Sequence, residues 1–232
     1  MNPNENRTLL EHYADLRVAD VRDGMDVVFR HHYASMDPSI RPLFRTRAWG
    51  IARTVRYVPF QGGLPLGIQA DKYYHEWIPE YYRTICPYPW IEQIQEGDFI
   101  VIDQSEMNVG LMGSENTLNC IIRGVRGFVS NGGVRDTDEI IHQKIPFWSR
   151  YISQTNVIGR LQFDSMDIPV SVGGITIYPG DVVVADGDGI IVVPRDIALE
   201  VARYAHKEHE QDKKARKSHY QQLGWPEDET VR

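Results

Sequence analysis

The chain has 232 residues, of which 42% are hydrophobic and 25% are charged, with two cysteines and a formal net charge of −7. This composition is that of a globular protein and excludes global disorder and a disulfide-dense scaffold. The acidic balance argues against nonspecific nucleic-acid binding, for which a basic face is expected. We therefore expect no nucleic-acid partner.

Two features of the sequence bear on its location. The N-terminal stretch MNPNENRTLLEHYADL is polar and contains no apolar signal core, and no apolar run approaches the roughly 20 residues that span a bilayer. We expect a cytoplasmic protein without a membrane partner. Cys120 falls in an apolar helical pattern and is expected in the core, whereas Cys86 lies in a Pro- and Tyr-rich stretch. A disulfide between them stays open, although a reducing compartment is favoured.

The first third of the chain predicts helices and then a strand. Apolar residues recur at three- and four-residue spacing in the span 8–33, as in Leu9, Leu10 and Tyr13, which is typical of helices. The next stretch, SMDPSIRPLF, carries two prolines and predicts a loop. The alternating stretch GIARTVRYVPF at 50–60 predicts a strand, and the residues that follow to position 70 form a Gly/Pro turn region.

Residues 71–94 are crowded with aromatic side chains and interrupted by three prolines. The pattern predicts one short helix followed by a loop. The first interpretation is a local aromatic cluster or a subunit contact. The alternative is a lid or a wall that determines substrate specificity.

The middle of the chain has regular alternation. We expect a strand, a glycine-containing loop, a helix, a short strand with a turn, and a second helix at residues 97–103, 105–113, 114–124, 127–133 and 136–142. Leu118, Ile121 and Ile122 fall on one face of the first helix, and Ser114 is a favourable residue at its start. This order predicts a packed α/β layer.

The last third is mostly strand. Four β-rich runs are separated by Gly-Gly, Pro-Gly-Asp and Asp-Gly-Asp-Gly turns, and they lie at residues 169–172, 175–178, 181–185 and 189–194. A long charged helix is expected from Asp196 to about Tyr220, followed by a mobile tail.

The first candidate for chemistry is the glycine loop that leads into the helix at 114. Backbone N–H groups around Gly113, Ser114, Glu115 and Asn116 would have no partner within the helix. With the helix dipole, they form a ready site for a carboxylate or phosphate. Such a loop is a weak signal by itself, because many helices begin after a glycine.

The second candidate is the charged cluster after the next glycine turn. It contains one arginine and three acidic residues: Arg135, Asp136, Asp138 and Glu139. Arginine offers a fork of donors that matches a carboxylate, and oxygen ligands suit Mg²⁺ or Mn²⁺. Arg-Asp also occurs at two other places in the chain, and acidic residues are common at helix starts. The Arg-Asp dipeptide alone therefore does not indicate a functional site. The sequence around it has to show whether one is present.

The surroundings resemble a known family. The block RGVRGFVSNGGVRDTDEI is followed by IPVSVGGITIYPGDVVVADGDGIIVVP, and the pair resembles the RraA-like family, which includes regulators of ribonuclease activity and metal-dependent aldolases. The resemblance extends to VRDGMD, IRPL and GIARTV and covers most of the chain. The aromatic segment at 71–94 fits it poorly.

The resemblance implies a set of site residues. The family's aldolases carry an acidic residue, twenty further residues, Arg-Asp, and then Glu or Asp three positions after that Asp. Arg135, Asp136 and Glu139 match the second half, whereas Ser114 stands where the acidic residue is expected, with Glu115 beside it. By this resemblance Arg135 and Asp136 are catalytic, and Asp136 holds Mg²⁺ (or Mn²⁺). Glu139 contacts the metal through water or braces Arg135, and Ser114 contacts the metal only through water.

The same resemblance implies a mechanism. The metal chelates a small 2-oxo acid and acts as a Lewis acid on the enolate left by carbon–carbon cleavage. Arg135 and the main chain at 113–116 bind the substrate. A neighbouring subunit's C-terminal helix is expected to add an acidic residue, for which Glu208, Glu210 and Asp212 are the candidates.

The fold implied is an α/β swivelling β/β/α-type domain with N-terminal helices and a long C-terminal helix. We expect an N-terminal helical segment at 1–48, a core at 49–196 and a C-terminal helix and tail at 197–232, assembled as a homotrimer or a hexamer. The favoured activity is an aldolase or decarboxylase acting on a small 2-oxo acid such as 4-hydroxy-4-methyl-2-oxoglutarate or oxaloacetate, with release of pyruvate. The alternative is a non-catalytic regulator that binds an RNA-degrading enzyme.

Overall fold

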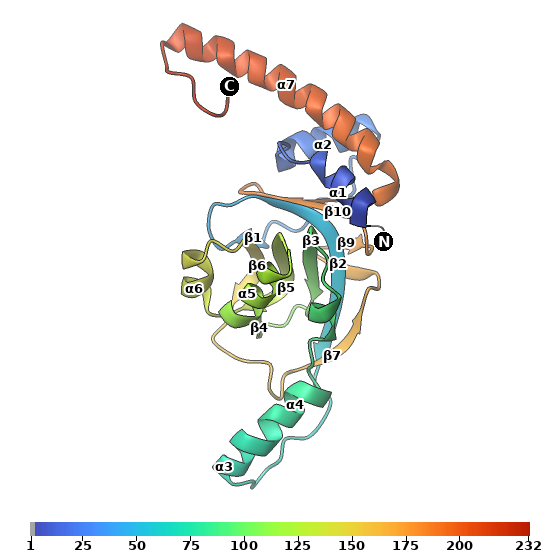
Figure 1. Ribbon diagram of the computed structural model, residues 1–232, viewed down its shortest axis with the longest axis vertical. Helices are drawn as coiled ribbons and strands as arrows, with labels where there is room; N and C mark the ends of the chain where they lie inside the picture. The colour runs from blue at the N-terminus through green and yellow to red at the C-terminus, as the bar shows by residue number, and fades with distance from the viewer. Residues whose placement is uncertain (1–2) are drawn as a thin grey trace.

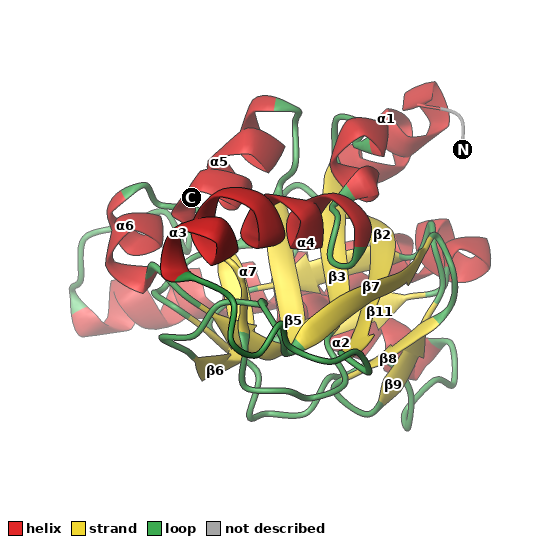
Figure 2. Cartoon of the chain, turned by 90° about the horizontal axis from the view of Figure 1, so that it is seen from below, coloured by secondary structure: helices red, strands yellow, loops and turns green. Residues whose placement is uncertain are grey.

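Runs rich in valine and isoleucine build one large mixed sheet. The computed structural model describes residues 3–232. The sheet has nine strands: β1 (Arg41–Pro42), β2 (Ala48–Pro59), β3 (Asp98–Asp103), β4 (Gly110–Met112), β5 (Gly127–Val134), β6 (Phe147–Ile152), β7 (Leu161–Met166), β10 (Val182–Ala185) and β11 (Ile190–Val193). Their order is β1-β6-β5-β3-β2-β10-β11, with β4 paired to β5 and β7 to β2. The sheet curls strongly, as a long twisted sheet must (Figure 2).

The centre of the sheet is parallel and its margins are antiparallel. Strands β2, β3, β5 and β6 run in the same direction, and β4 adds to β5 in parallel. Helices α5 (Ser114–Ile122) and α6 (Thr137–His142) follow β4 and β5. Because parallel strands end at a common edge, the segments that begin these two helices come together there.

Three helices cover one end of the sheet. They are α1 (Pro3–Glu11), α2 (Val18–Val27) and α7 (Ala198–Leu223), the last preceded by a 3₁₀ turn η3 (Arg195–Ile197). Figure 1 shows the three helices together at this end of the molecule. Leu10, Val21 and Val201 pack there with the buried valines of β10 and β11. These helices confirm the helices predicted for the two ends of the chain, except that the N-terminal prediction, which ran to residue 33, was wrong after Val27.

The aromatic segment forms a helical arm at the opposite end of the molecule (Figure 1). It consists of α3 (Ala70–Lys72), the π-helical turn η1 (Tyr73–Trp77), α4 (Ile78–Thr84) and, after a turn, the 3₁₀ helix η2 (Pro89–Gln93). The predicted short helix is present, but it is longer than expected because η1 continues directly into α4 at Pro79, an early position where proline is tolerated.

The C-terminal strands agree with the prediction. Strands β8 (Val170–Val172) and β9 (Ile175–Ile177) form a separate antiparallel pair, and β10 and β11 form another within the large sheet. The predicted loop at 105–113 was wrong at its end, because β4 pairs with β5 there. The expected swivelling α/β architecture with a long C-terminal helix is present.

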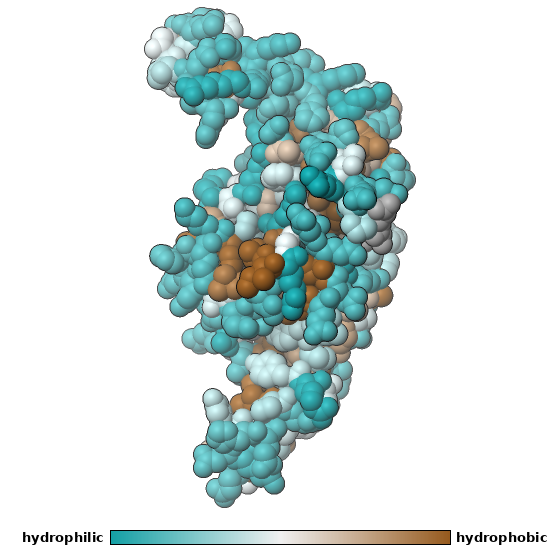
Figure 3. Space-filling view, viewed as in Figure 1, coloured by the Kyte–Doolittle hydropathy of each residue, from teal (hydrophilic) through white to brown (hydrophobic). Residues whose placement is uncertain are grey.

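Two of the three residues on the predicted apolar face of α5 point outwards, which the amphipathic pattern did not indicate, whereas Ile121 packs against the core. Ile122 is 83% exposed and Leu118 is 40% exposed, whereas Thr117 and Cys120 are buried against the sheet. The space-filling view shows an apolar patch at this position (Figure 3). A hydrophobic pattern identifies an apolar face but not what covers it.

The two cysteines are free and buried, so the disulfide left open by the sequence is not formed. Burial raises the pKa of the Cys86 thiol and of the Cys120 thiol to about 12. Neither is an activated nucleophile. Within the described residues, no helix combines the length and the apolar character needed to cross a bilayer.

Candidate functional site

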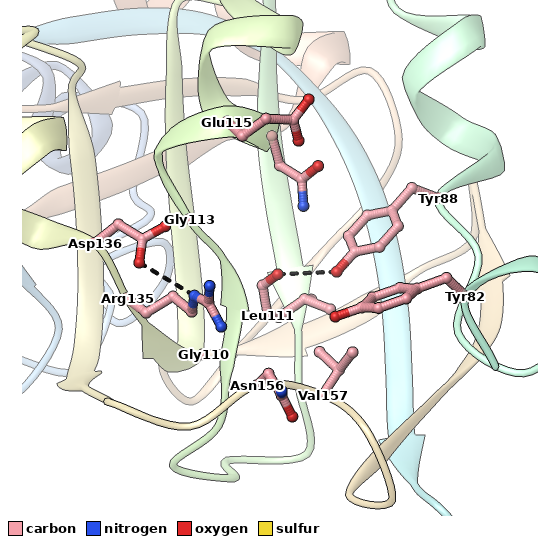
Figure 4. A pocket seen from close by; sticks show the side chains of 11 residues that line it. Tyr82, Tyr88, Gly110, Leu111, Gly113, Glu115, Arg135, Asp136, Asn156 and Val157 are labelled. Atoms are coloured by element: carbon pink, nitrogen blue, oxygen red, sulfur yellow. Dashed lines mark hydrogen bonds and ion pairs between the residues drawn. The ribbon is translucent and has the colours of Figure 1, made fainter. Parts of the chain in front are cut away.

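A cavity of about 350 Å³ opens where β4 and β5 meet α5 and α6 (Figure 4). One wall comes from the glycine loop, the start of α5 and the turn after β5: Gly110, Leu111, Gly113, Glu115, Asn116, Arg135 and Asp136. The opposite wall comes from the aromatic arm and the loop before β7: Tyr82, Tyr88, Asn156 and Val157. Both predicted halves of the site therefore lie in one cavity.

Asp136 is held in an unusual conformation at the start of α6. Its φ of 54° lies in the left-handed region, which non-glycine residues rarely adopt. Its Oδ2 accepts a hydrogen bond of 3.2 Å from the backbone N–H of Ser114. A side chain at position 113 would collide with this same oxygen, so Gly113 is needed for the approach. Strained residues persist where their surroundings fix them, and they cluster at functional sites.

Arg135 lies beside this carboxylate. Its Nε donates to Asp136 Oδ1 at 3.2 Å, and the two side chains are 40% and 33% exposed. A Cβ at Gly110 would lie 2.9 Å from the Arg135 Cβ, so this glycine makes room for the arginine. The guanidinium is directed across the cavity towards the aromatic arm (Figure 4). Its terminal N–H groups are therefore available to an anionic ligand.

The start of α5 offers further donors. The N–H groups of Ser114, Glu115 and Asn116 precede the first intrahelical bond, which Thr117 N–H makes to the Gly113 carbonyl. Asp136 takes the first of these donors. The positive end of the helix dipole is thus partly neutralised by a side chain of the protein itself.

Of the predicted site residues, Gly113, Glu115, Asn116, Arg135 and Asp136 line the cavity together. The others do not line it. Ser114 contributes only its backbone N–H group, which donates a hydrogen bond to Asp136. Glu139 is exposed on α6.

The acidic residues proposed for a neighbouring site lie on α7, at the opposite end of the molecule from the aromatic arm (Figure 1). Glu208 is half-buried and Glu210 is exposed. Asp212 approaches the Arg17 and Arg216 guanidinium groups at 3.4 Å and 3.3 Å. None of the three lines the cavity of its own chain.

Sequence reasoning missed the wall formed by Tyr82, Tyr88, Asn156 and Val157. Tyr88 is fixed there by donating its hydroxyl hydrogen to the Leu111 carbonyl at 2.9 Å. Burial raises the pKa of Tyr88 well above its usual value, so it is a neutral phenol. Burial also raises the pKa of Tyr82, against the opposing effect of the Arg135 charge. The aromatic crowding at 71–94 was the available signal, but it did not indicate which rings reach the cavity.

The lining residues fit a loosely held Mg²⁺ better than a closed metal site. Asp136 and Glu115 are the two carboxylates in the lining, and the Glu115 carboxylate is turned away from Asp136 (Figure 4). No group of three or more His, Cys, Asp or Glu side chains within residues 3–232 is placed to hold a metal. Mg²⁺ commonly uses one or two carboxylates and keeps several waters, which this donor set permits.

Known proteins resemble parts of the sequence. A protein named "Putative 4-hydroxy-4-methyl-2-oxoglutarate aldolase" from Halalkalibacterium halodurans is 31% identical over 126 residues, covering 50% of this chain and 55% of that protein. An uncharacterized protein of Methanocaldococcus jannaschii is 28% identical over 116 residues, covering 50% of this chain and 55% of the relative. The match thus spans about half the length of these curated relatives.

Solved structures match more of the chain. An uncharacterized protein from Pseudomonas syringae pv. tomato has a TM-score of 0.74 at 26% identity, over 95% of this chain and 94% of that one. Streptomyces coelicolor RraAS2, described as an unusual member of the RNase ES inhibitor RraA family, has a TM-score of 0.70 at 23% identity, over 90% and 96%; it supports the fold alone. The family model described as RraA-like, Aldolase/RraA, matches residues 18–192. The chain belongs to the RraA-like family.

Proposed function

We propose that this protein is a divalent-metal-dependent carbon–carbon lyase that cleaves a small 2-oxo acid and releases pyruvate. The observation that carries the proposal is the convergence of Arg135, Asp136 and the start of α5 on one cavity. A cationic fork, a carboxylate and unpaired main-chain donors form a binding site for a keto acid. The aldolase names of the relatives add support.

Different residues of the cavity bind different parts of the substrate and the metal ion. The terminal N–H groups of Arg135 pair with the substrate carboxylate, while its Nε stays on Asp136. The N–H groups of Glu115 and Asn116 supply donors for a second oxygen. Asp136 positions the guanidinium and provides the charged oxygen ligand on which a Mg²⁺ or Mn²⁺ ion would depend.

The same charges favour bond cleavage. When the bond between C3 and C4 breaks, negative charge develops on the keto oxygen, and Arg135 is placed to stabilise it. A bound divalent ion supplies Lewis-acid polarisation of that oxygen. The fixed hydrogen bond from Ser114 N–H keeps the Asp136 carboxylate in position without rearrangement during the reaction.

The assembly belongs to this proposal. The exposed face of α5, with Leu118 and Ile122, begins at the cavity edge and is the surface we expect a second copy of the chain to cover in a homotrimer or hexamer. Glu208, Glu210 and Asp212 are too remote to act within their own chain. They remain candidates for a neighbour's site only.

The test is pyruvate release from 4-hydroxy-4-methyl-2-oxoglutarate and from oxaloacetate, with Mg²⁺ and with a chelator. Asp136→Asn removes the charge yet keeps a residue that tolerates the left-handed conformation. Asp138→Asn, an exposed position on the same helix, is the matched control. We expect metal-dependent turnover that is lost only in Asp136→Asn. No turnover and no metal binding by the wild type would favour the regulator that binds an RNA-degrading enzyme.

A further inference from the structure

Tyr82 is the one side chain of the aromatic arm that enters the cavity with an unengaged hydroxyl. Its neighbour Tyr81 is fully buried and donates its hydroxyl hydrogen to the Leu161 carbonyl at 2.6 Å, which fixes α4 on the body of the protein. Tyr88 uses its hydroxyl on the Leu111 carbonyl. The Tyr82 hydroxyl has no hydrogen-bond partner within residues 3–232, and Tyr82 is 37% exposed.

The Tyr82 ring faces Arg135 across the cavity. Figure 4 shows the Tyr82 and Tyr88 rings entering from the side opposite Arg135 and Asp136, with their hydroxyl ends directed inwards. Burial raises the pKa of Tyr82, and the Arg135 charge acts in the opposite direction. A ligand whose carboxylate pairs with Arg135 therefore extends its other end towards Tyr82.

The residues that line the cavity at that other end, Tyr82, Tyr88, Asn156 and Val157, are uncharged, and the nearby Arg160 guanidinium is engaged by Asn156. Arg135 is the single cationic side chain among the described residues that line the cavity, and the first carboxylate of the substrate uses it. Glu115 lines the same cavity, and its negative charge adds to burial in raising the pKa of Tyr88. A second substrate carboxylate would lie beside the uncharged Tyr82 and Val157 without a cationic partner in the lining, which is unfavourable.

We infer that Tyr82 selects the substrate, which is a 4-hydroxy-2-oxo acid with an uncharged distal group, and that the Tyr82 hydroxyl hydrogen-bonds to its C4 hydroxyl. This inference rests on the proposed function. Within that function, it makes monocarboxylates the preferred substrates, ahead of dicarboxylates such as 4-hydroxy-4-methyl-2-oxoglutarate and oxaloacetate. A neutral phenol both donates and accepts hydrogen bonds, so it can hold the C4 hydroxyl while the apolar side chains of Leu111 and Val157 contact the alkyl group.

The reaction balances without an oxidant or a reductant. For 4-hydroxy-2-oxopentanoate, the C3–C4 bond breaks, its electron pair moves onto the C2–C3 unit, and the C4 hydroxyl gives up its proton to water. C4 leaves as acetaldehyde, and C3 regains a proton to give pyruvate. Tyr82 orients the C4 hydroxyl for this step.

The experiment compares two substrates that differ only in their distal group: 4-hydroxy-2-oxopentanoate and 4-hydroxy-2-oxoglutarate. We expect the wild type to favour the first by at least about tenfold in kcat/KM. Tyr82→Phe keeps the ring and should lower kcat/KM for 4-hydroxy-2-oxopentanoate by about tenfold, the usual effect of one lost hydrogen bond. Tyr74→Phe, on the 66% exposed Tyr74 of the same arm, should leave it unchanged.

Calorimetric binding of two uncleavable ligands separates this inference from the proposed function. 2-Oxopentanoate should bind more tightly than 2-oxoglutarate and equally well to wild type and Tyr82→Phe, because it lacks the hydroxyl. Preference for the dicarboxylate in either assay, or unchanged kinetics in Tyr82→Phe, overturns the inference and leaves the lyase proposal standing. No binding and no turnover of any 2-oxo acid overturns both.

Discussion

Replacing Gly113 by alanine tests whether the approach of Asp136 to α5 matters. Gly113 has a φ of −134°, an extended conformation that alanine adopts without strain. The added methyl group would nevertheless collide with Asp136 Oδ2, so the carboxylate must move away from the Ser114 N–H. The substitution therefore displaces the proposed site carboxylate without removing its charge.

The expected cost in stability is small and can be worked from the contact that is lost. A hydrogen bond to a charged group contributes about 1.5–3 kcal/mol, and the lower end applies because Asp136 is 33% exposed. The Gly→Ala change stabilises the folded protein by about 0.4–1 kcal/mol, because it lowers the conformational entropy of the unfolded chain. The net destabilisation is about 1 kcal/mol, which lowers the Tm by roughly 2–4 °C for a chain of this size.

The expected cost in activity is larger, because a displacement of about 1 Å at a reacting site can lower a rate by about a hundredfold. Thermal unfolding and kcat/KM for pyruvate release measure the two effects separately. Gly63→Ala is the matched control, since nothing lies within 4 Å of a Cβ built there. Wild-type kcat/KM in Gly113→Ala would refute the importance of the Asp136 position.

The other predictions concern Arg135, the thiols and the α5 surface. Arg135→Ala should lower kcat/KM by about a hundredfold or more while changing the free energy of unfolding by less than about 1 kcal/mol, because the side chain is 40% exposed; equal kinetics would contradict its role. Since burial raises the thiol pKa values of Cys86 and Cys120 to about 12, neither should react with iodoacetamide at pH 8 unless the protein is unfolded, and alkylation of the folded protein would contradict this. Ile122→Glu should shift the sedimentation coefficient towards that of the monomer, whereas an unchanged assembly would exclude this face as the contact.

The sequence predicted part of the central layer of the fold, namely β2, β3, β5, α5 and α6, but not the strands β4, β6 and β7. The glycine loop, the helix at 114 and the Arg135–Asp136 pair lie in consecutive β-α units, so their meeting at one sheet edge follows from local order. The terminal helices and the four C-terminal strands were predicted because their periodicity and turns are local signals.

The opposite wall of the cavity could not be predicted in the same way. Tyr82 reaches the cavity because Tyr81 is anchored to the carbonyl of Leu161, 80 residues along the chain. Such a long-range contact has no local signal in the sequence. The exposure of Ile122 on α5 was also not predicted, because the periodicity does not indicate that the sheet covers the small Cys120 and leaves Ile122 uncovered.

The most direct test of the central claim is a crystal structure of the protein soaked with Mg²⁺ and pyruvate. We expect pyruvate in the cavity with its carboxylate on the Arg135 guanidinium, and the cation beside an Asp136 oxygen. Pyruvate bound elsewhere, or a cation that does not contact Asp136, would contradict the account.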